Sequence, residues 1–117
     1  MKITLTLLLL LILSACSKVD DETLLAAHLA HQKGAIIVDV RTPVEFKAKH
    51  IKGAINLPLQ ELHNTYVRLT KGKEIIVYCR SGNRSATASN LLRKEGYIVY
   101  DVATQGDWER DISKQIK

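Results

Sequence analysis

Residues 75–85 read Ile75-Ile76-Val77-Tyr78-Cys79-Arg80-Ser81-Gly82-Asn83-Arg84-Ser85. The apolar run that ends at Cys79 is typical of a buried strand in a parallel sheet. A short polar loop that contains a glycine follows it, and a helix is predicted to begin near Arg84 or Ser85. Ligands bind beyond the carboxyl ends of the strands in open parallel sheets. Cys79 therefore stands where a functional site is expected.

Helical and strand-like patterns alternate along the rest of the chain, without internal repeats or Pro/Gly-rich linkers. This alternation predicts an α/β domain with an open, mostly parallel sheet. Thr42-Pro43-Val44-Glu45 carries the signature of a capping box with proline at the first helical position. The expected strands are 35–40, 53–58, 74–79 and 97–100, and the expected helices are 20–32, 42–49, 59–69, 85–95 and 107–116.

The first fifteen residues have the layout of a bacterial secretory signal peptide. The apolar run from Ile3 to Leu13 is short for a membrane-spanning helix. Leu13-Ser14-Ala15-Cys16 is similar to the lipobox, in which the cysteine is acylated after cleavage. The alternative is an ordinary signal peptide that ends before a cysteine by chance.

The lipobox interpretation gives three expected parts of the chain: a signal peptide over 1–15, a lipid-attached tether over 16–23 and a catalytic domain over 24–117. Acylated Cys16 would hold the protein to a lipid bilayer on the periplasmic side of a bacterial membrane. The Ser17 that follows favours the outer membrane.

Two cysteines are present in 117 residues, Cys16 and Cys79. If Cys16 carries lipid, Cys79 has no partner for a disulfide. An unpaired thiol in an oxidising compartment is exposed to mixed disulfides and over-oxidation, so its presence suggests chemistry. The net charge of +5 comes without a long basic run or interleaved aromatic residues, which argues against nucleic-acid binding. We expect a monomer.

The loop after Cys79 predicts a nucleophile that is held as a thiolate. Backbone N–H groups of the curled loop, the helix N-terminus and the charges of Arg80 and Arg84 all favour the negative form of the sulfur. The same cradle would bind a donor oxyanion and stabilise charge on a persulfide. The alternative is that Cys79 is a small buried apolar residue. The candidate substrate-binding residues are Arg80, Ser81, Gly82, Asn83, Arg84 and Ser85.

The segment 79–85 resembles the active-site loop of rhodaneses, and three further segments agree with that family in order and spacing. These segments are Val38-Asp39-Val40-Arg41, Glu45-Phe46 and His50-Ile51-Lys52-Gly53-Ala54-Ile55-Asn56-Leu57-Pro58. The resemblance implies a sheet of about five strands with helices on both faces. It also implies transfer of sulfane sulfur from thiosulfate or a similar small anion to a thiophilic acceptor through a Cys79 persulfide.

Loop length distinguishes this interpretation from its nearest rival. Tyrosine phosphatases and the arsenate reductases that resemble them place five residues between cysteine and arginine, whereas four separate Cys79 from Arg84. The shorter loop suits a persulfide sulfur better than a tetrahedral phosphoryl group. Asp101 and Asp107 remain possible general acids for the rival chemistry. A persulfide carrier that serves a partner protein is the other alternative.

Several residues outside the loop have a structural and a functional interpretation. Asp39 and Arg41 follow a strand at the same sheet edge as Cys79, and they form either a loop-ordering ion pair or part of the substrate site. Glu45 is expected to cap a helix, and His50 to pack in a loop. The remaining histidines, His28, His31 and His63, lack metal-ligand spacing, so neither a metal nor another cofactor is expected.

Two departures from the family pattern concern the ends of the domain. Rhodaneses open with a short strand before the first helix, but only 16–20 precede that helix here, so this edge strand is expected to be missing or merged with the tether. The family also shows paired glycines after its last strand. Thr104-Gln105-Gly106-Asp107-Trp108 has one glycine, which leaves the pocket wall from this segment undefined.

Overall fold

The computed structural model describes residues 19–113. Their α-helices and strands follow one another as α2 (Asp21–Gln32), β1 (Ile36–Asp39), α3 (Pro43–Ala48), β2 (Ile55–Asn56), α4 (Leu62–Thr65), β3 (Ile75–Cys79), α5 (Asn83–Lys94), β4 (Val99–Thr104) and α6 (Gln105–Trp108). Two 3₁₀ turns, η2 (Leu59–Glu61) and η3 (Tyr66–Arg68), flank α4. The predicted signal peptide, the lipobox and Cys16 lie outside the described residues.

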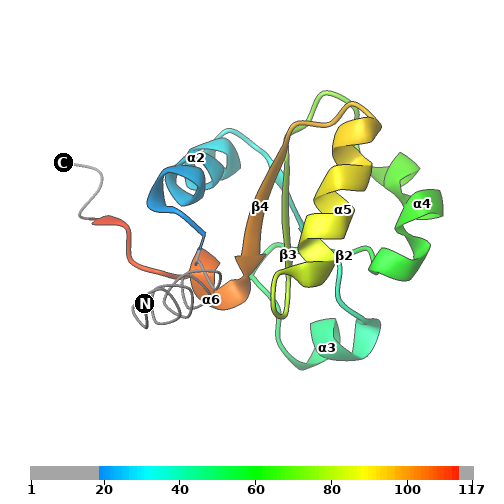
Figure 1. The fold of residues 1–117 in the computed structure, drawn as a ribbon, viewed down its shortest axis with the longest axis horizontal. Coiled ribbons are helices and arrows are strands. Elements are labelled where there is room, and N and C mark those ends of the chain that lie inside the picture. Colours follow the sequence, from blue (N-terminus) through cyan, green and yellow to red (C-terminus); the bar gives the residue numbers. More distant parts are fainter. Residues whose placement is uncertain (1–18, 114–117) are drawn as a thin grey trace, which may run out of the picture.

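All pairings in the sheet are parallel, in the order β2-β1-β3-β4. Helices α2 and α6 lie on one side of the sheet, and α4 and α5 lie on the other (Figure 1). The predicted α/β class and parallel sheet are therefore confirmed. The described residues contain four strands where about five were expected, and the segment expected to lack the edge strand, 16–20, lies mostly outside them.

Alternating side chains of the central strands build two apolar layers. On the α5 side, Val38 and Val77 pack with Cys79, while on the α2 side Ile37 and Tyr78 pack with helix residues. All five residues of β3 are buried, as the apolar run predicted. The strand is thereby fixed on both faces, so the position of its last residue is well defined. Among residues 19–113, no helix combines the length and apolar content needed to cross a membrane.

The short helix α3 shows why local sequence predicted it well. Thr42 caps it, accepting the Glu45 N–H at 3.3 Å, while a Glu45 oxygen accepts the Thr42 N–H at 3.2 Å. Pro43 occupies the first helical position, where its missing N–H is not needed. The predicted capping box is confirmed, and it fixes α3 beside the carboxyl end of the sheet.

Three expected elements differ most from the structure, and the strand expected over 53–58 is shorter, at Ile55–Asn56. The helix expected over 59–69 is divided into η2, α4 and η3, since Asn64, Thr65 and Val67 are weak helix formers. Its apolar face still packs on the sheet through Leu62 and Leu69. The last strand begins two residues later than expected and continues to Thr104. The helix expected from Asp107 begins at Gln105 and ends at Trp108, whose buried side chain anchors it.

Candidate active site

Cys79 is the last residue of β3, and its side chain lies at the carboxyl edge of the sheet with 2% of the residue exposed. The Gly82 N–H donates a hydrogen bond to Cys79 Sγ at 3.0 Å. Gly82 has φ 99°, in the left-handed region that favours glycine, and it immediately precedes α5. The chain therefore turns back within three residues and presents a backbone donor and a helix N-terminus to the sulfur.

The loop is fixed by bonds to the Gly82 carbonyl oxygen. Ser85 Oγ donates to this oxygen at 3.0 Å, and the Ala86 N–H donates at 3.1 Å. Several loop N–H groups were expected to point at the sulfur, but within the described residues only that of Gly82 is hydrogen-bonded to it. The next amides belong to the first turn of α5. Three members of the predicted set, Arg80, Ser81 and Asn83, are exposed or half-buried and make no hydrogen bond to the sulfur.

Arg84 joins the loop to α3. Its Nη1 and Nη2 atoms donate to the two Glu45 oxygens at 2.6 and 2.9 Å. The hydrogen-bonded Arg84 lowers the pKa of Glu45 to about 2. The pKa of Arg84 is raised, first by the Glu45 carboxylate and in smaller part by the Cys79 sulfur. Arg84, a candidate substrate-binding residue, and Glu45, the predicted helix cap, thus form one ion pair that the sequence analysis did not predict.

Asp39 and Arg41 form an ion pair next to the Cys79 strand. Asp39 is fully buried, and Arg41 Nη2 and Nε donate to its carboxylate at 2.6 and 3.0 Å. Arg41 also donates to the Lys49 carbonyl oxygen at 2.6 Å. Its guanidinium carbon lies 5.4 Å from the centre of the Tyr78 ring. Burial, together with a hydrogen bond to Asp39, raises the pKa of Tyr78 to about 12. The geometry supports the loop-ordering interpretation, because the pair ties three segments together.

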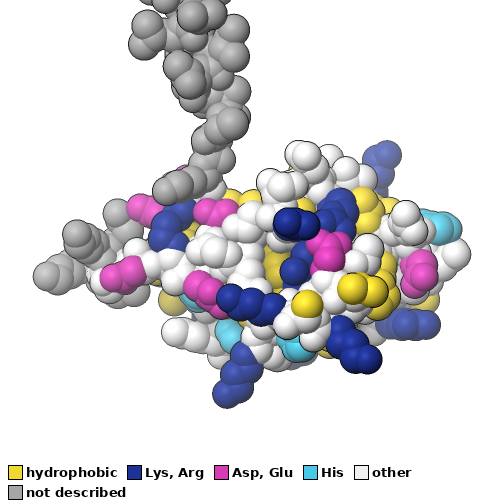
Figure 2. Space-filling model, turned by 90° about the horizontal axis from the view of Figure 1, so that it is seen from below, with side chains coloured by type: hydrophobic (Ala, Val, Ile, Leu, Met, Phe, Trp, Pro, Cys, Tyr) yellow, Lys and Arg dark blue, Asp and Glu magenta, His cyan; other side chains and the backbone are white. Residues whose placement is uncertain are grey.

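The face that carries the loop is rich in cations. Seen from the end of the molecule where β3 ends, several Lys and Arg side chains gather around an acidic one (Figure 2). A cleft of about 330 Å³ borders this region, with Arg84 at one side and Pro43 and Leu59 among its apolar walls. Such a surface favours an anion near the sulfur and leaves apolar room beside it.

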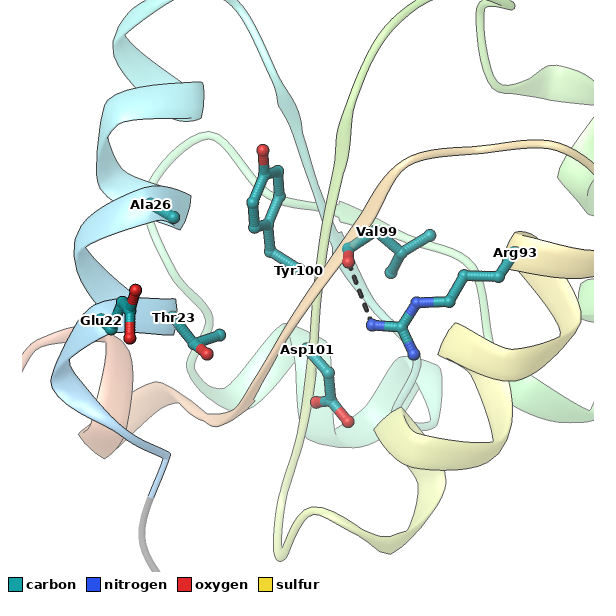
Figure 3. Close-up of a pocket in the computed structure, with 7 residues that line it drawn as sticks. All are labelled: Glu22, Thr23, Ala26, Arg93, Val99, Tyr100 and Asp101. Atoms are coloured by element: carbon teal, nitrogen blue, oxygen red, sulfur yellow. Dashed lines mark hydrogen bonds between the residues drawn. The ribbon is translucent and has the colours of Figure 1, made fainter.

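Other candidate residues lie apart from Cys79. His50 Nδ1 bonds the Phe46 carbonyl oxygen at 2.8 Å and its ring stacks on Phe46, as the packing interpretation predicted. A larger cleft of about 600 Å³ opens between α2, α5 and β4. Arg93 and Asp101 project into it beside Tyr100, and none of its lining residues belongs to the Cys79 loop (Figure 3). Sequence reasoning also missed Ala103, whose left-handed backbone no local pattern signals.

Comparisons with known proteins agree with this geometry. A protein-family model described as Rhodanese-like domain matches residues 22–105. A sulfurtransferase of Allochromatium vinosum is 33% identical over 81 residues, which cover 69% of this chain and 75% of the relative. Thiosulfate sulfurtransferase PspE of Escherichia coli is 36% identical over 51% of this chain and 60% of its own length. Putative sulfur carrier protein YrkF of Bacillus subtilis is 34% identical over 62% of this chain.

The chain spans only part of many relatives, 40% of YrkF and 38% of the uncharacterized protein slr1261 of Synechocystis. Solved structures are similar as well. A rhodanese-related protein of Thermoplasma volcanium superposes with a TM-score of 0.60 at 36% identity, covering 65% of this chain and 77% of that one. A rhodanese with anions from E. coli gives 0.57 at 32% identity, covering 67% of this chain and 95% of that one.

Proposed function

The chain belongs to the rhodanese family, and from that premise we propose that it moves sulfane sulfur from thiosulfate or a similar anion to a thiophilic acceptor through a persulfide on Cys79. The observation that carries the proposal is the hydrogen bond from the Gly82 N–H to Cys79 Sγ at the N-terminus of α5. A thiolate gains from both the donor and the helix dipole. Supporting roles fall to the loop residues and to the Asp39–Arg41 pair.

The proposed cycle has two displacement steps. Cys79 thiolate attacks the outer sulfur of thiosulfate, a bond forms between Sγ and that sulfur, and sulfite leaves with the electron pair of the broken S–S bond. The acceptor then attacks the outer sulfur of the persulfide, and the electron pair of the second S–S bond returns to Sγ. With cyanide as acceptor, the product is thiocyanate and the thiolate is regenerated. The Gly82 N–H and the loop cations stabilise the negative sulfur in both resting forms.

The direct test is mass analysis of the Cys16→Ser chain before and after thiosulfate, and again after cyanide. We expect Cys79 to gain one sulfur atom, and cyanide to remove it with one equivalent of thiocyanate released. Cys79→Ser in the same background is the matched control and should gain nothing. A free Cys79 thiol that takes up no sulfur would contradict the thiosulfate proposal, and arsenate or phosphate esters would then be tested.

A sulfur-carrier function is the second candidate, favoured by the similarity to a putative sulfur carrier protein. Both functions require the persulfide, and they differ in turnover. A carrier would hold a stable persulfide and turn over slowly with cyanide, whereas a small-molecule sulfurtransferase would release thiocyanate over many cycles. Steady-state thiocyanate formation therefore distinguishes them.

A further inference from the structure

The strand next to β3 contains a register break opposite the Cys79 end. Val77 pairs with Asp101, but Tyr78 pairs with Ala103, so Val102 is an extra residue. The Asp101 carboxylate accepts the Ala103 N–H at 3.0 Å and closes a short turn around it. Such bulges redirect side chains at strand ends. This one places Thr104 opposite Cys79 and Ala103 just before it.

Ala103 adopts φ 60° and is the one non-glycine residue of 19–113 with a positive φ. The left-handed region is unfavourable for a residue with a Cβ atom, because that atom approaches the following carbonyl oxygen. Residues held this way persist where the surrounding structure determines them, and they cluster at functional sites. Glycine would remove the strain, so the alanine methyl group calls for a reason.

The methyl group of Ala103 faces Gly82. A Cβ atom built on Gly82 would stand 3.4 Å from Ala103 Cβ, at ordinary van der Waals range, and beyond the chain neighbours no other heavy atom lies within 4 Å of that position. Gly82 is also the residue whose N–H donates to Cys79 Sγ. Its carbonyl oxygen is held from the α5 side by Ser85. Gly82 is thus held between α5 and Ala103.

We propose that Ala103 is a positioning residue for Cys79: its methyl group holds Gly82 so that the Gly82 N–H stays on the sulfur. The inference rests on the proposed function for its effect on sulfur transfer, but its effect on the thiol itself is independent of any donor. The strained backbone of Ala103 and its position next to Gly82 then serve the same purpose, although β4 contributes no side chain to the reaction.

Ala103→Gly tests this role, because glycine adopts φ 60° freely and removes only the methyl group. We expect Cys79 alkylation by iodoacetamide at pH 6.5 to slow by roughly three- to tenfold, since the hydrogen bond to the charged sulfur is partly lost. Alkylation is read by peptide mass in the full chain, which separates Cys79 from Cys16. With thiosulfate, kcat should fall while KM stays within about twofold, because the donor contacts are unchanged.

Two variants serve as controls. Ala54→Gly makes the same chemical change at a residue that packs in the apolar layer on the α2 side of the sheet, and it should alkylate at the wild-type rate. Ala103→Asn keeps a Cβ atom and suits the left-handed region better than other non-glycine residues, so it should restore the rate. Wild-type alkylation in Ala103→Gly, or a rate in Ala103→Asn as slow as in the glycine variant, would overturn the proposal. If the wild type takes no sulfur from thiosulfate, the proposed function fails while the alkylation comparison still decides the role of Ala103.

Discussion

Removing Arg41 should show whether the buried ion pair orders the loops or binds substrate. In Arg41→Met, the fully buried Asp39 loses three side-chain hydrogen bonds of 2.6 to 3.0 Å and keeps those from the Arg41 N–H at 2.9 Å and from the Tyr78 hydroxyl. Leaving one partner of a buried pair uncompensated destabilises proteins by about 3–5 kcal/mol. Domains of this size have a free energy of unfolding of roughly 5–15 kcal/mol, so the loss is large.

Urea unfolding followed by circular dichroism measures the effect. With a slope near 1.5 kcal/mol/M, the midpoint should fall by about 2–3 M. Asp39→Asn/Arg41→Met should recover part of the loss, because no buried charge remains unpaired. Arg68→Met removes an exposed arginine and should change the free energy of unfolding by less than about 0.5 kcal/mol.

Sulfur uptake by the same variants is measured under conditions in which each variant is folded. If the pair only orders loops, sulfur uptake per folded Arg41→Met molecule should stay within about threefold of wild type. A destabilisation below about 1 kcal/mol would refute the burial argument. A large rise in KM for thiosulfate in a stable Arg41→Met protein would show that Arg41 contacts the donor.

Three further predictions concern other parts of the chain. Because the pKa of Glu45 is depressed, its ion pair with Arg84 contributes stability above about pH 4.5, and this contribution is lost as the pH falls toward about 2. Glu45→Gln should therefore flatten the dependence of the free energy of unfolding on pH in this range, as measured by urea titration. Gly82→Ala should lose about 1–2 kcal/mol of unfolding free energy, because its φ of 99° is unfavourable for a residue with a Cβ atom, and sulfur uptake by mass should slow. Cys16→Ser should abolish acylation, so membrane fractionation should find either unprocessed protein, as lipobox cleavage predicts, or soluble protein, as an ordinary signal peptide predicts.

Local sequence predicted the elements whose signals are local. The apolar run to Cys79 and the glycine at position 82 predicted the strand, loop and helix that make the site. The capping box likewise predicted α3. In each case the residues that define the element are neighbours in the chain, so propensity and pattern were sufficient.

Long-range contacts account for what sequence reasoning missed. Glu45 and Arg84 are 39 residues apart, and each had a sufficient local explanation, so nothing in the chain pairs them. Alanine carries no signal for a left-handed backbone, and the turn at Ala103 depends on the register of β4 against β3. In the segment 59–69, the apolar side chains pack on the sheet as predicted, but the backbone does not form one continuous α-helix. Packing on the sheet determines which side chains are buried more strongly than it determines the backbone hydrogen-bond pattern.

The order of the sheet leaves β4 at an outer edge among the described residues. Unpaired strand edges are templates on which identical chains can add strands and aggregate, and bulges and charges are common protections. Arg93 already occupies one edge carbonyl oxygen, that of Val99, at 3.0 Å (Figure 3). The turn at Asp101–Ala103 interrupts the rest of the strand. The irregularity beside Cys79 thus also shortens the regular strand edge that is available for intermolecular pairing. A β4 rebuilt as a regular strand would lose this protection against aggregation.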